Sequence, residues 1–344
     1  MSSGKHFHNV LCLSEAKGMD ITMNKFIDPV IVPKKKLYTG VEIPCIGMGT
    51  FGSDRVSPKE VSDAVLGATD CGYRLFDCAA CYGNEDQIGQ VFQKAFDERI
   101  VERKDLFVMS KVWNDMHRDV EKACLKSISD LKCDYLDMYF IHWPFPNYHA
   151  PGCDVDSRNP DSKPFSVEEF VDTYRQCEEL VEKGIIRHIG ISNMTIPKMD
   201  AVLPLMKIKP AAAEIEMHPT FQQREIQEYL EMRNILPIGY MPIGSPRRPE
   251  RDIMEEDISD LEMLEIQTIA KAHDVHPAIV CTEMGTSKWA GADSIFGTQL
   301  CCKFKMYDRR SAVRRRDGNN VYFGAWKQVS QRSCVFVGKC KGLA

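Results

Sequence analysis

Four side chains of complementary chemistry lie at or just beyond the ends of apolar, strand-like segments. Asp77, Lys111 and His142 each close such a segment, and Tyr82 lies five residues beyond Asp77. The pKa of a free phenol is about 10, but a neighbouring ammonium stabilises the phenolate and lowers that value. Lys111 could supply the ammonium, Asp77 could hold it charged, and His142 could orient a carbonyl oxygen. Together these residues suit the protonation of a carbonyl during hydride delivery from a nicotinamide.

Such residues need a scaffold that brings strand ends together, and the alternation of strand-like and helical segments predicts one. Strands are expected over 46–49, 74–77, 106–111, 136–142, 186–191, 211–216 and 237–240. Helices are expected over 58–71, 85–98, 120–131, 167–183, 197–203, 222–233 and 260–272. Repeated βα units form parallel sheets, and polar residues at the carboxyl ends of barrel strands converge on one mouth. The sequence therefore predicts an α/β fold, a (β/α)8 TIM-type barrel whose eighth unit is incomplete or atypical.

Taken one at a time, the same residues have ordinary structural explanations. An Asp–Lys pair is usually a salt bridge, a histidine at a strand end is often simply hydrogen-bonded, and Tyr82 could be an interface aromatic residue. Their joint occurrence at successive strand ends, together with the polar pair Ser192–Asn193 at the end of a further segment, favours one shared site.

A glycine-rich segment offers a competing interpretation. Residues 47–52 read Gly-Met-Gly-Thr-Phe-Gly, which matches a dinucleotide-binding fingerprint, and Asp77 closes the next strand where a ribose-binding acid would lie. That fingerprint requires a helix to begin within the glycine turn. Here Ser53–Ser57 intervene and the helix is expected to begin at Pro58, so the pattern favours the barrel over a Rossmann dehydrogenase.

Composition narrows the class of protein. The chain has 344 residues, of which 44% are apolar, as in a globular protein with a large core. Its net charge of −5 argues against a general nucleic-acid binder. No apolar run is long enough to span a membrane, and Met1–Asp20 lacks a secretion signal, so we expect a cytoplasmic protein. Its fourteen cysteines are then expected to be reduced. Cys78 and Cys81 have redox or zinc spacing, but no second pair supports a metal site, and no metal is expected.

Three regions of the chain differ in character. Residues 1–36 are expected to be a poorly structured leader, and Leu37–Glu42 to belong to a small hairpin on the barrel floor. Residues 37–281 carry the regular alternation of the barrel. After Cys281 the alternation stops, so we assign 282–344 to a divergent C-terminal segment.

Several motifs in order resemble the aldo-keto reductase superfamily. They are Gly72–Asp77, Tyr82–Glu85, Ser110–Trp113, Asp134–Pro144, Gly190–Asn193, Glu214–Pro219 and Tyr240–Ser245, and the matches run from about Val41 to Cys281. The resemblance implies an NADPH cofactor across the strand ends and the reduction of aldehydes or ketones of small molecules to alcohols. We further expect a monomer, and the net charge and the lack of a long apolar run argue against a nucleic-acid or membrane partner.

The resemblance implies a role for each matching residue. Tyr82 is the expected general acid, tuned by Lys111 and Asp77, and His142 is expected to orient the carbonyl. The cofactor-binding residues are expected to be Ser192, Asn193 and Glu214 at the carboxamide, Tyr240 at the nicotinamide ring and Ser245 near the pyrophosphate. The walls of the substrate site are expected to be Phe51, Trp113 and Trp143, although such aromatic residues are also commonly plain core.

Two departures from the family pattern affect these expectations. Glu214 stands where the family usually has Gln, and a carboxylate can accept a hydrogen bond from the carboxamide but cannot donate one. The family's eighth strand and its contacts to the adenosine 2′-phosphate are not recognisable after Cys281.

Several alternatives therefore stay open for the tail. It either leaves barrel edges unpaired or fills the gap with Ser294–Phe296 or Cys334–Val337. Its arginines, Arg309, Arg310 and Arg314–Arg316, either replace the phosphate contacts or form a solvated basic tail. The rival function is a catalytically compromised barrel that acts as a binding or regulatory protein.

Overall fold

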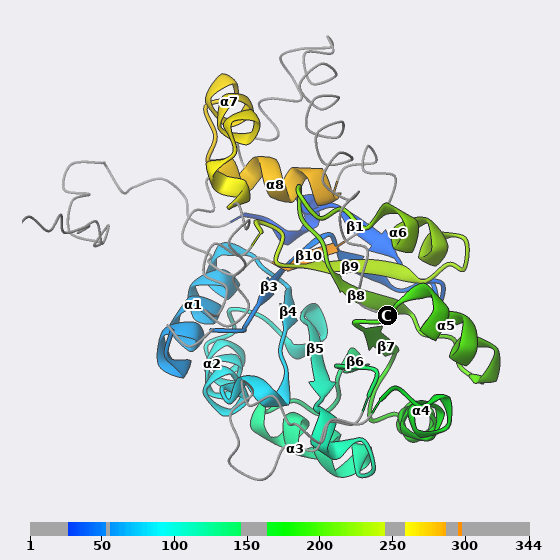
Figure 1. Cartoon of the computed structure of the whole chain (residues 1–344). Helices are drawn as coiled ribbons and strands as arrows, with labels where there is room; N and C mark the ends of the chain where they lie inside the picture. Colours follow the sequence, from blue (N-terminus) through cyan, green and yellow to red (C-terminus); the bar gives the residue numbers. More distant parts are fainter. Residues whose placement is uncertain (1–26, 53–55, 146–163, 245–258, 287–294, 298–344) are drawn as a thin grey trace, which may run out of the picture.

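A closed barrel of eight parallel strands forms the centre of the molecule, as the computed structural model shows (Figure 1). The model describes residues 27–52, 56–145, 164–244, 259–286 and 295–297. Around the barrel the strands follow the order β10-β3-β4-β5-β6-β7-β8-β9. Their bounds are β3 Ile46–Gly49, β4 Leu75–Asp77, β5 Phe107–Val112, β6 Met138–Ile141, β7 Ile189–Ser192, β8 Ala212–Glu216, β9 Leu236–Tyr240 and β10 Ile295–Gly297. The predicted (β/α)8 fold is confirmed.

Helices follow most of the strands and surround the barrel (Figure 1). Their bounds are α1 Pro58–Cys71, α2 Glu85–Asp97, α3 Val120–Asp130, α4 Val167–Glu182, α5 Ile196–Val202, α6 Arg224–Glu231, α7 Leu264–Ala272 and α8 Pro277–Thr286. Local sequence sets these bounds. At α1, Ser57 and Glu60 form a capping box, Pro58 opens the helix, and Gly72 ends it with a φ of 106°. The helix predicted over 260–272 is divided, because Asp260–Glu262 forms a 3-10 turn, η8, before α7 begins.

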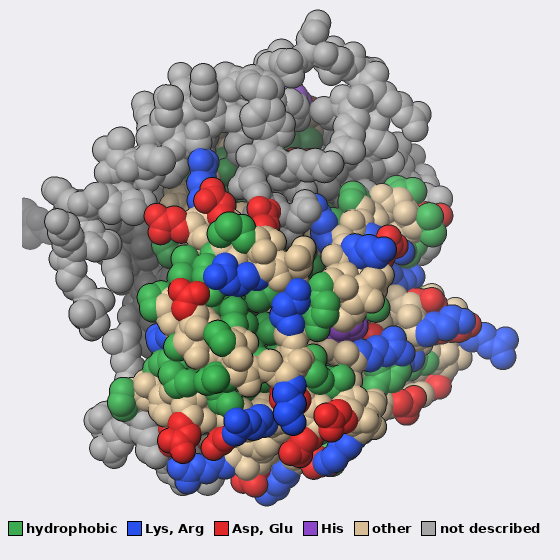
Figure 2. Space-filling model, turned by 90° about the vertical axis from the view of Figure 1, so that its right-hand side faces the viewer, with side chains coloured by type: hydrophobic (Ala, Val, Ile, Leu, Met, Phe, Trp, Pro, Cys, Tyr) green, Lys and Arg blue, Asp and Glu red, His purple; other side chains and the backbone are tan. Residues whose placement is uncertain are grey.

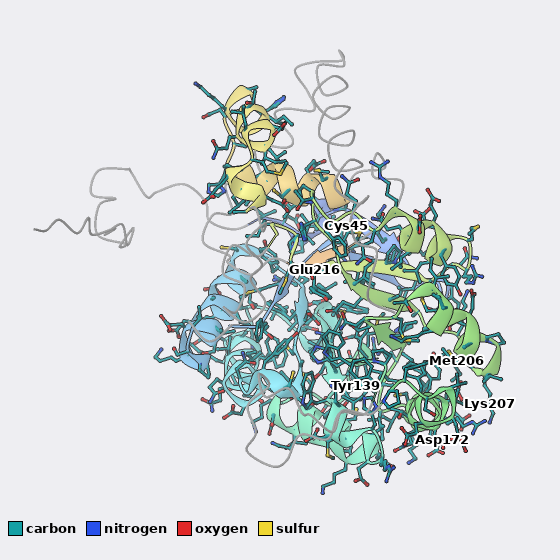
Figure 3. All side chains as sticks on the ribbon, viewed as in Figure 1. Cys45, Tyr139, Asp172, Met206, Lys207 and Glu216 are labelled. Atoms are coloured by element: carbon teal, nitrogen blue, oxygen red, sulfur yellow. The ribbon has the colours of Figure 1, made fainter. Side chains whose placement is uncertain are left out.

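Two apolar layers hold the barrel together, as strand alternation requires. One face of strands β4, β5, β6, β8 and β9 contributes to a cluster inside the barrel that contains Leu75, Phe107, Met109 and Phe140. The opposite face packs against the helices in a larger cluster; Tyr139, labelled in Figure 3, belongs to it and is fully buried. Because successive side chains point to opposite faces, a polar residue two positions beyond an interior residue also points inward.

The eighth strand is supplied by the segment that the sequence marked as divergent. Phe296 of β10 pairs with Ile46 of β3 and with Gly239 of β9, so the barrel is closed. Of the alternatives for the tail, the segment near Ser294–Phe296 is therefore the one that fills the gap, and unpaired edges on β3 and β9 are excluded. Cys334–Val337 and the tail arginines lie outside the described residues.

The floor of the barrel carries the predicted hairpin. Strands β1, Lys34–Lys36, and β2, Glu42–Pro44, pair in antiparallel fashion, and Leu37 and Ile43 join the interior cluster. The hairpin thus begins within the segment assigned to the leader, and a short 3-10 turn, η1 Pro29–Ile31, precedes it. Those residues are structured because the hairpin buries apolar side chains against the barrel interior. Residues 1–26 lie outside the described part of the chain.

The glycine-rich segment serves barrel packing, and the Rossmann interpretation is wrong. Gly47 lies on β3, where a Cβ atom would collide with the side chain of Leu75 on the next strand. A glycine is therefore required for close approach of two interior positions. The helix begins only at Pro58, as the sequence indicated.

The described part of the outer surface is charged with both signs. Figure 2 shows Lys and Arg side chains interspersed with Asp and Glu over one face of the molecule. Asp172 on α4 lies at the periphery in Figure 3, where it pairs with Arg175 at 3.1 Å. Within the described residues, no helix combines the length and apolarity that crossing a membrane requires.

Candidate active site at the barrel mouth

Strand alternation brings the predicted site residues to one end of the barrel interior. Lys111 lies two positions beyond the interior residue Met109, and Asp77 lies two positions beyond Leu75. The same spacing from interior residues places His142 after Phe140, Glu214 after Ala212 and Tyr240 after Ile238. Asp77, Lys111, His142 and Tyr240 lie at or next to the carboxyl ends of parallel strands, and Glu214 is two residues from the end of β8. The period-2 geometry of strands therefore explains the convergence that the sequence predicted.

Lys111 is the centre of the site. Its side chain is fully buried, and its Nζ donates to Asp77 Oδ1 at 2.5 Å and to the carbonyl oxygen of Cys78 at 3.1 Å. The same Nζ lies 3.4 Å from the hydroxyl of Tyr82 and 3.5 Å from Glu214 Oε1. One ammonium thus contacts two carboxyl groups and the phenol.

Electrostatics keep this ammonium charged. Burial alone would lower the pKa of Lys111, but attraction to Asp77, then to Glu214 and Tyr82, outweighs burial and raises the pKa well above its ordinary value. Burial raises the pKa of Asp77, and the adjacent Lys111 acts in the opposite direction. The short contact between these two groups is the strongest ionic interaction of the site.

Tyr82 is held by backbone and by aromatic neighbours. It ends the 3-10 turn η3, Ala80–Tyr82, and Gly83 follows with a φ of 64°. Its ring centroid lies 5.1 Å from that of Phe51 and 5.9 Å from that of His142. Burial raises the pKa of the Tyr82 phenol well above its ordinary value, and Lys111 opposes that shift without reversing it. The sequence predicted the direction of the lysine's effect, but the net shift is upward because burial is the larger cause.

His142 is buried beside the phenol and uncharged. The residue is 8% exposed, and burial, then the positive charge of Lys111, lowers the pKa of its imidazole well below the ordinary value. At neutral pH the imidazole is therefore neutral, with one ring nitrogen as donor and the other as acceptor. Nδ1 contacts the thiol of Cys81 at 3.5 Å.

The polar pair Ser192–Asn193, at the end of β7, is fixed by its neighbours. Asn193 has a φ of 57°, and its Nδ2 donates to the carbonyl of His142 at 2.9 Å and to Ser192 Oγ at 3.1 Å. The hydroxyl of Tyr240 donates to Asn193 Oδ1 at 2.8 Å, which fixes the tyrosine ring beside the pair. The register of β7 and β8 places Ser192 opposite Glu214. Four of the predicted cofactor-binding residues therefore lie together, whereas Ser245 lies outside the described residues.

The three aromatic residues predicted to line the substrate site have different neighbours. Phe51 contacts the ring of Tyr82, and the centroid of Trp113 lies 5.0 Å from that of His142. Trp143 instead packs against Phe145, at 6.0 Å between centroids. Two of the three aromatic residues thus adjoin the proton-donating groups directly.

Some contributing residues were not predicted from the sequence. Thr50 Oγ1 donates to the backbone carbonyl of Asp77 at 2.9 Å, and Asn84 Nδ2 donates to the carbonyl of Thr50 at 2.8 Å, so both residues support the loop that carries Tyr82. Cys81 contacts His142. Its position directly before Tyr82 in the sequence could have indicated that it lies at the site. Cys78 and Cys81 are both free thiols, and no cluster of metal ligands occurs among the described residues.

Comparisons with known proteins agree with this geometry. The model of the family described as "Aldo/keto reductase family" matches residues 45–295, which includes all eight barrel strands except the end of β10. The chain belongs to the aldo/keto reductase family. Family membership makes it an oxidoreductase of the carbonyl-reducing class.

Individual relatives of this aldo/keto reductase are similar over most of their length. Aldo-keto reductase family 1 member A1 of Gallus gallus is 40% identical over 231 residues, which cover 64% of this chain and 68% of the relative. Aldose reductase of Encephalitozoon cuniculi is 36% identical over 251 residues, covering 72% and 79%. Among solved structures, the aldose reductase of Schistosoma japonicum has a TM-score of 0.70 and 28% identity, and the match covers 87% of this chain and 92% of that one.

Proposed function

We propose that the protein reduces aldehyde or ketone groups of small molecules to alcohols with NADPH, and that Tyr82 is the proton donor. The observation that carries this proposal is the position of Lys111 Nζ, 2.5 Å from Asp77 Oδ1 and 3.4 Å from the Tyr82 hydroxyl. A buried ammonium beside a phenol stabilises the phenolate that remains after proton transfer. The same ammonium is anchored by Asp77, so it need not move during the reaction.

Each residue contributes to moving one proton. The neutral imidazole of His142 donates a hydrogen bond that orients the substrate carbonyl oxygen beside the phenol. Tyr82 gives its proton to that oxygen as negative charge develops there. Lys111 then faces the phenolate, and Asp77 keeps the ammonium in place. A bound nicotinamide supplies the hydride.

The residues at the ends of β7, β8 and β9 fit a nicotinamide. Glu214 is 3% exposed, and its Oε2 is buried without a hydrogen-bond partner among the described residues, which is expected of a group that awaits a ligand. Ser192 and Asn193 would hold the carboxamide with Glu214, and the fixed ring of Tyr240 would stack on the nicotinamide ring. Ser245 would lie near the pyrophosphate.

Binding of the dinucleotide is the test of this proposal. We expect NADPH to quench the fluorescence of Trp113 and Trp143, because both side chains lie at the end of the barrel that carries the site, and NADH serves as the comparison. Saturable quenching by NADPH, and tighter binding of NADPH than of NADH, would support the cofactor assignment. Absence of quenching by either dinucleotide would contradict it.

The alternative is a binding or regulatory protein with the same barrel. It is favoured by the tail, in which the usual side chains for a 2′-phosphate are not recognisable. This alternative predicts that NADPH binds but no aldehyde is reduced. The closed barrel and the contacts of Lys111 favour the enzyme, because a protein that only binds has no need of a buried ammonium beside a phenol.

We also propose how the chain is organised and where it acts. The barrel unit comprises 37–281 together with the hairpin strand from Lys34 and the strand β10. The remaining parts of 1–36 and 282–344 are a leader and a divergent segment. We propose that the protein works as a cytoplasmic monomer on a small-molecule carbonyl.

A further inference from the structure

Two carboxyl groups share one ammonium inside the barrel mouth. Lys111 Nζ lies 2.5 Å from Asp77 Oδ1 and 3.5 Å from Glu214 Oε1. The side chain of Lys111 is fully buried and that of Glu214 is 4% exposed. If both carboxyl groups were ionised, the cluster would carry an excess negative charge in an environment that solvates charge poorly.

Among the described residues, Lys111 is the cation that contacts Glu214. His218 is also charged, because burial lowers its pKa but Asp260 and Glu216 outweigh burial and raise it to about 9, and its partners are those two carboxylates. Tyr82 on η3 faces Glu214 as a phenol, and ionisation of either group would oppose ionisation of the other. On β9, the hydroxyl of Tyr240 is bound to Asn193. On β8 itself, Glu216 contacts His218 at 3.3 Å and lies among the strands in Figure 3. His142, directly after β6, is neutral.

The geometry identifies which carboxyl group keeps the proton. Asp77 makes the shorter contact with Lys111, so its carboxylate gains the larger Coulomb stabilisation. Glu214 is farther from Nζ, and its Oε2 has no partner among the described residues. In agreement, burial, then repulsion by Asp77, raises the pKa of Glu214 to about 8 in spite of the attraction of Lys111.

We propose that Glu214 holds a proton in the resting site, that this proton lets it position the nicotinamide carboxamide as a primary amide would, and that its loss creates an anion that competes with Tyr82 for Lys111. This inference rests on the proposed function. Glu214 is thus a positioning residue that makes the site dependent on pH.

Two consequences follow from the protonation of this one group. A carboxylic acid has one donor and one acceptor oxygen, so Glu214 can do what the family's usual glutamine does, and the sequence-based expectation that it cannot donate applies only to the ionised form. When Glu214 ionises, its charge raises the pKa of Tyr82 further. Oxidation of an alcohol needs the phenolate as proton acceptor, so ionised Glu214 disfavours that direction at high pH.

The first arm of the test measures the proton in the protein without any ligand. Infrared difference spectra between wild type and Glu214→Gln should show the carbonyl band of a protonated carboxyl group at pH 6.5, and this band should disappear with a midpoint near pH 8. The matched control is Glu178→Gln, an equally buried glutamate that accepts from the backbone amides of Lys207 and Ile208 outside the mouth. If Glu214→Gln removes no such band, the proposal is wrong.

The second arm measures NADPH affinity by tryptophan quenching between pH 6.5 and pH 9. Wild type and Glu178→Gln should lose about tenfold in affinity across this range, because a donor is lost and a charge appears. Glu214→Gln should bind as wild type does at pH 6.5 and show a flatter profile. If NADPH affinity depended on pH in the same way in Glu214→Gln as in wild type, Glu214 would not be the positioning residue. If NADPH does not bind at all, the proposed function fails with that role, whereas the infrared arm still decides whether Glu214 holds the proton.

Discussion

Replacing Tyr82 by phenylalanine should lower kcat for aldehyde reduction by about 10²–10⁴-fold, which is the usual contribution of a positioned general acid. The change removes the hydroxyl that lies 3.4 Å from Lys111 Nζ and keeps the ring that packs against Phe51. The affinity for NADPH should stay nearly unchanged, because the phenol acts on the substrate oxygen. Steady-state kinetics with benzaldehyde, together with NADPH titration, measure the two effects separately.

Tyr139→Phe is the matched control for this variant. Tyr139 is fully buried between barrel and helices, and its hydroxyl has no hydrogen-bond partner among the described residues. Its removal should therefore leave kcat within about twofold of wild type, since neither substrate nor Lys111 is affected. If Tyr82→Phe retained most of its kcat, another residue would have to be the acid.

Replacing Lys111 by methionine should both abolish reduction and destabilise the fold. Removal of one partner of a buried ion pair leaves an uncompensated buried charge, which typically costs about 3 kcal/mol or more. Here the carboxylate of Asp77 loses its partner at 2.5 Å, whereas Glu214, which we propose to be protonated, loses a neighbouring ammonium at 3.5 Å and leaves no second charge. Urea unfolding should show a lower midpoint for Lys111→Met than for wild type. This decrease in the midpoint should be smaller at low pH, where Asp77 can take up a proton.

Lys59→Met makes the same change in an exposed pair. Lys59 lies 2.7 Å from Asp63 on the surface of α1, and its side chain is 80% exposed. Solvent screens such a pair, so we expect no measurable shift in the urea midpoint. Equal effects of the two variants would mean that the buried cluster at the mouth does not have the charges assigned to it.

Periodicity made the scaffold and most of the site predictable from the sequence. Alternating strand and helix segments predicted the barrel, and α1 has the predicted bounds because Ser57 and Gly72 define both of its ends locally. The strand-end positions of Asp77 and Lys111 followed from the same reasoning, because the spacing of two residues from interior positions is local information.

Long-range packing decided what the sequence could not predict. β10 has only the residues Ile295–Gly297, and its place between β3 and β9 depends on partners far away in the chain. The net rise in the pKa of Tyr82 depends on burial in the complete barrel. The protonation of Glu214 likewise requires the three-dimensional distances from one ammonium to two carboxyl groups. Trp143 packs against Phe145, a contact that its motif did not indicate.

Isotope transfer from the cofactor to the substrate tests the central claim most directly. The purified protein is incubated with benzaldehyde or glyceraldehyde and NADPH deuterated at the transferring carbon of the nicotinamide, and the product is analysed by mass spectrometry. Direct hydride delivery at the barrel mouth predicts an alcohol with one deuterium on the former carbonyl carbon, and Tyr82→Phe should form that alcohol about 10²–10⁴-fold more slowly. Absence of alcohol despite bound NADPH, or alcohol without deuterium, would contradict the account.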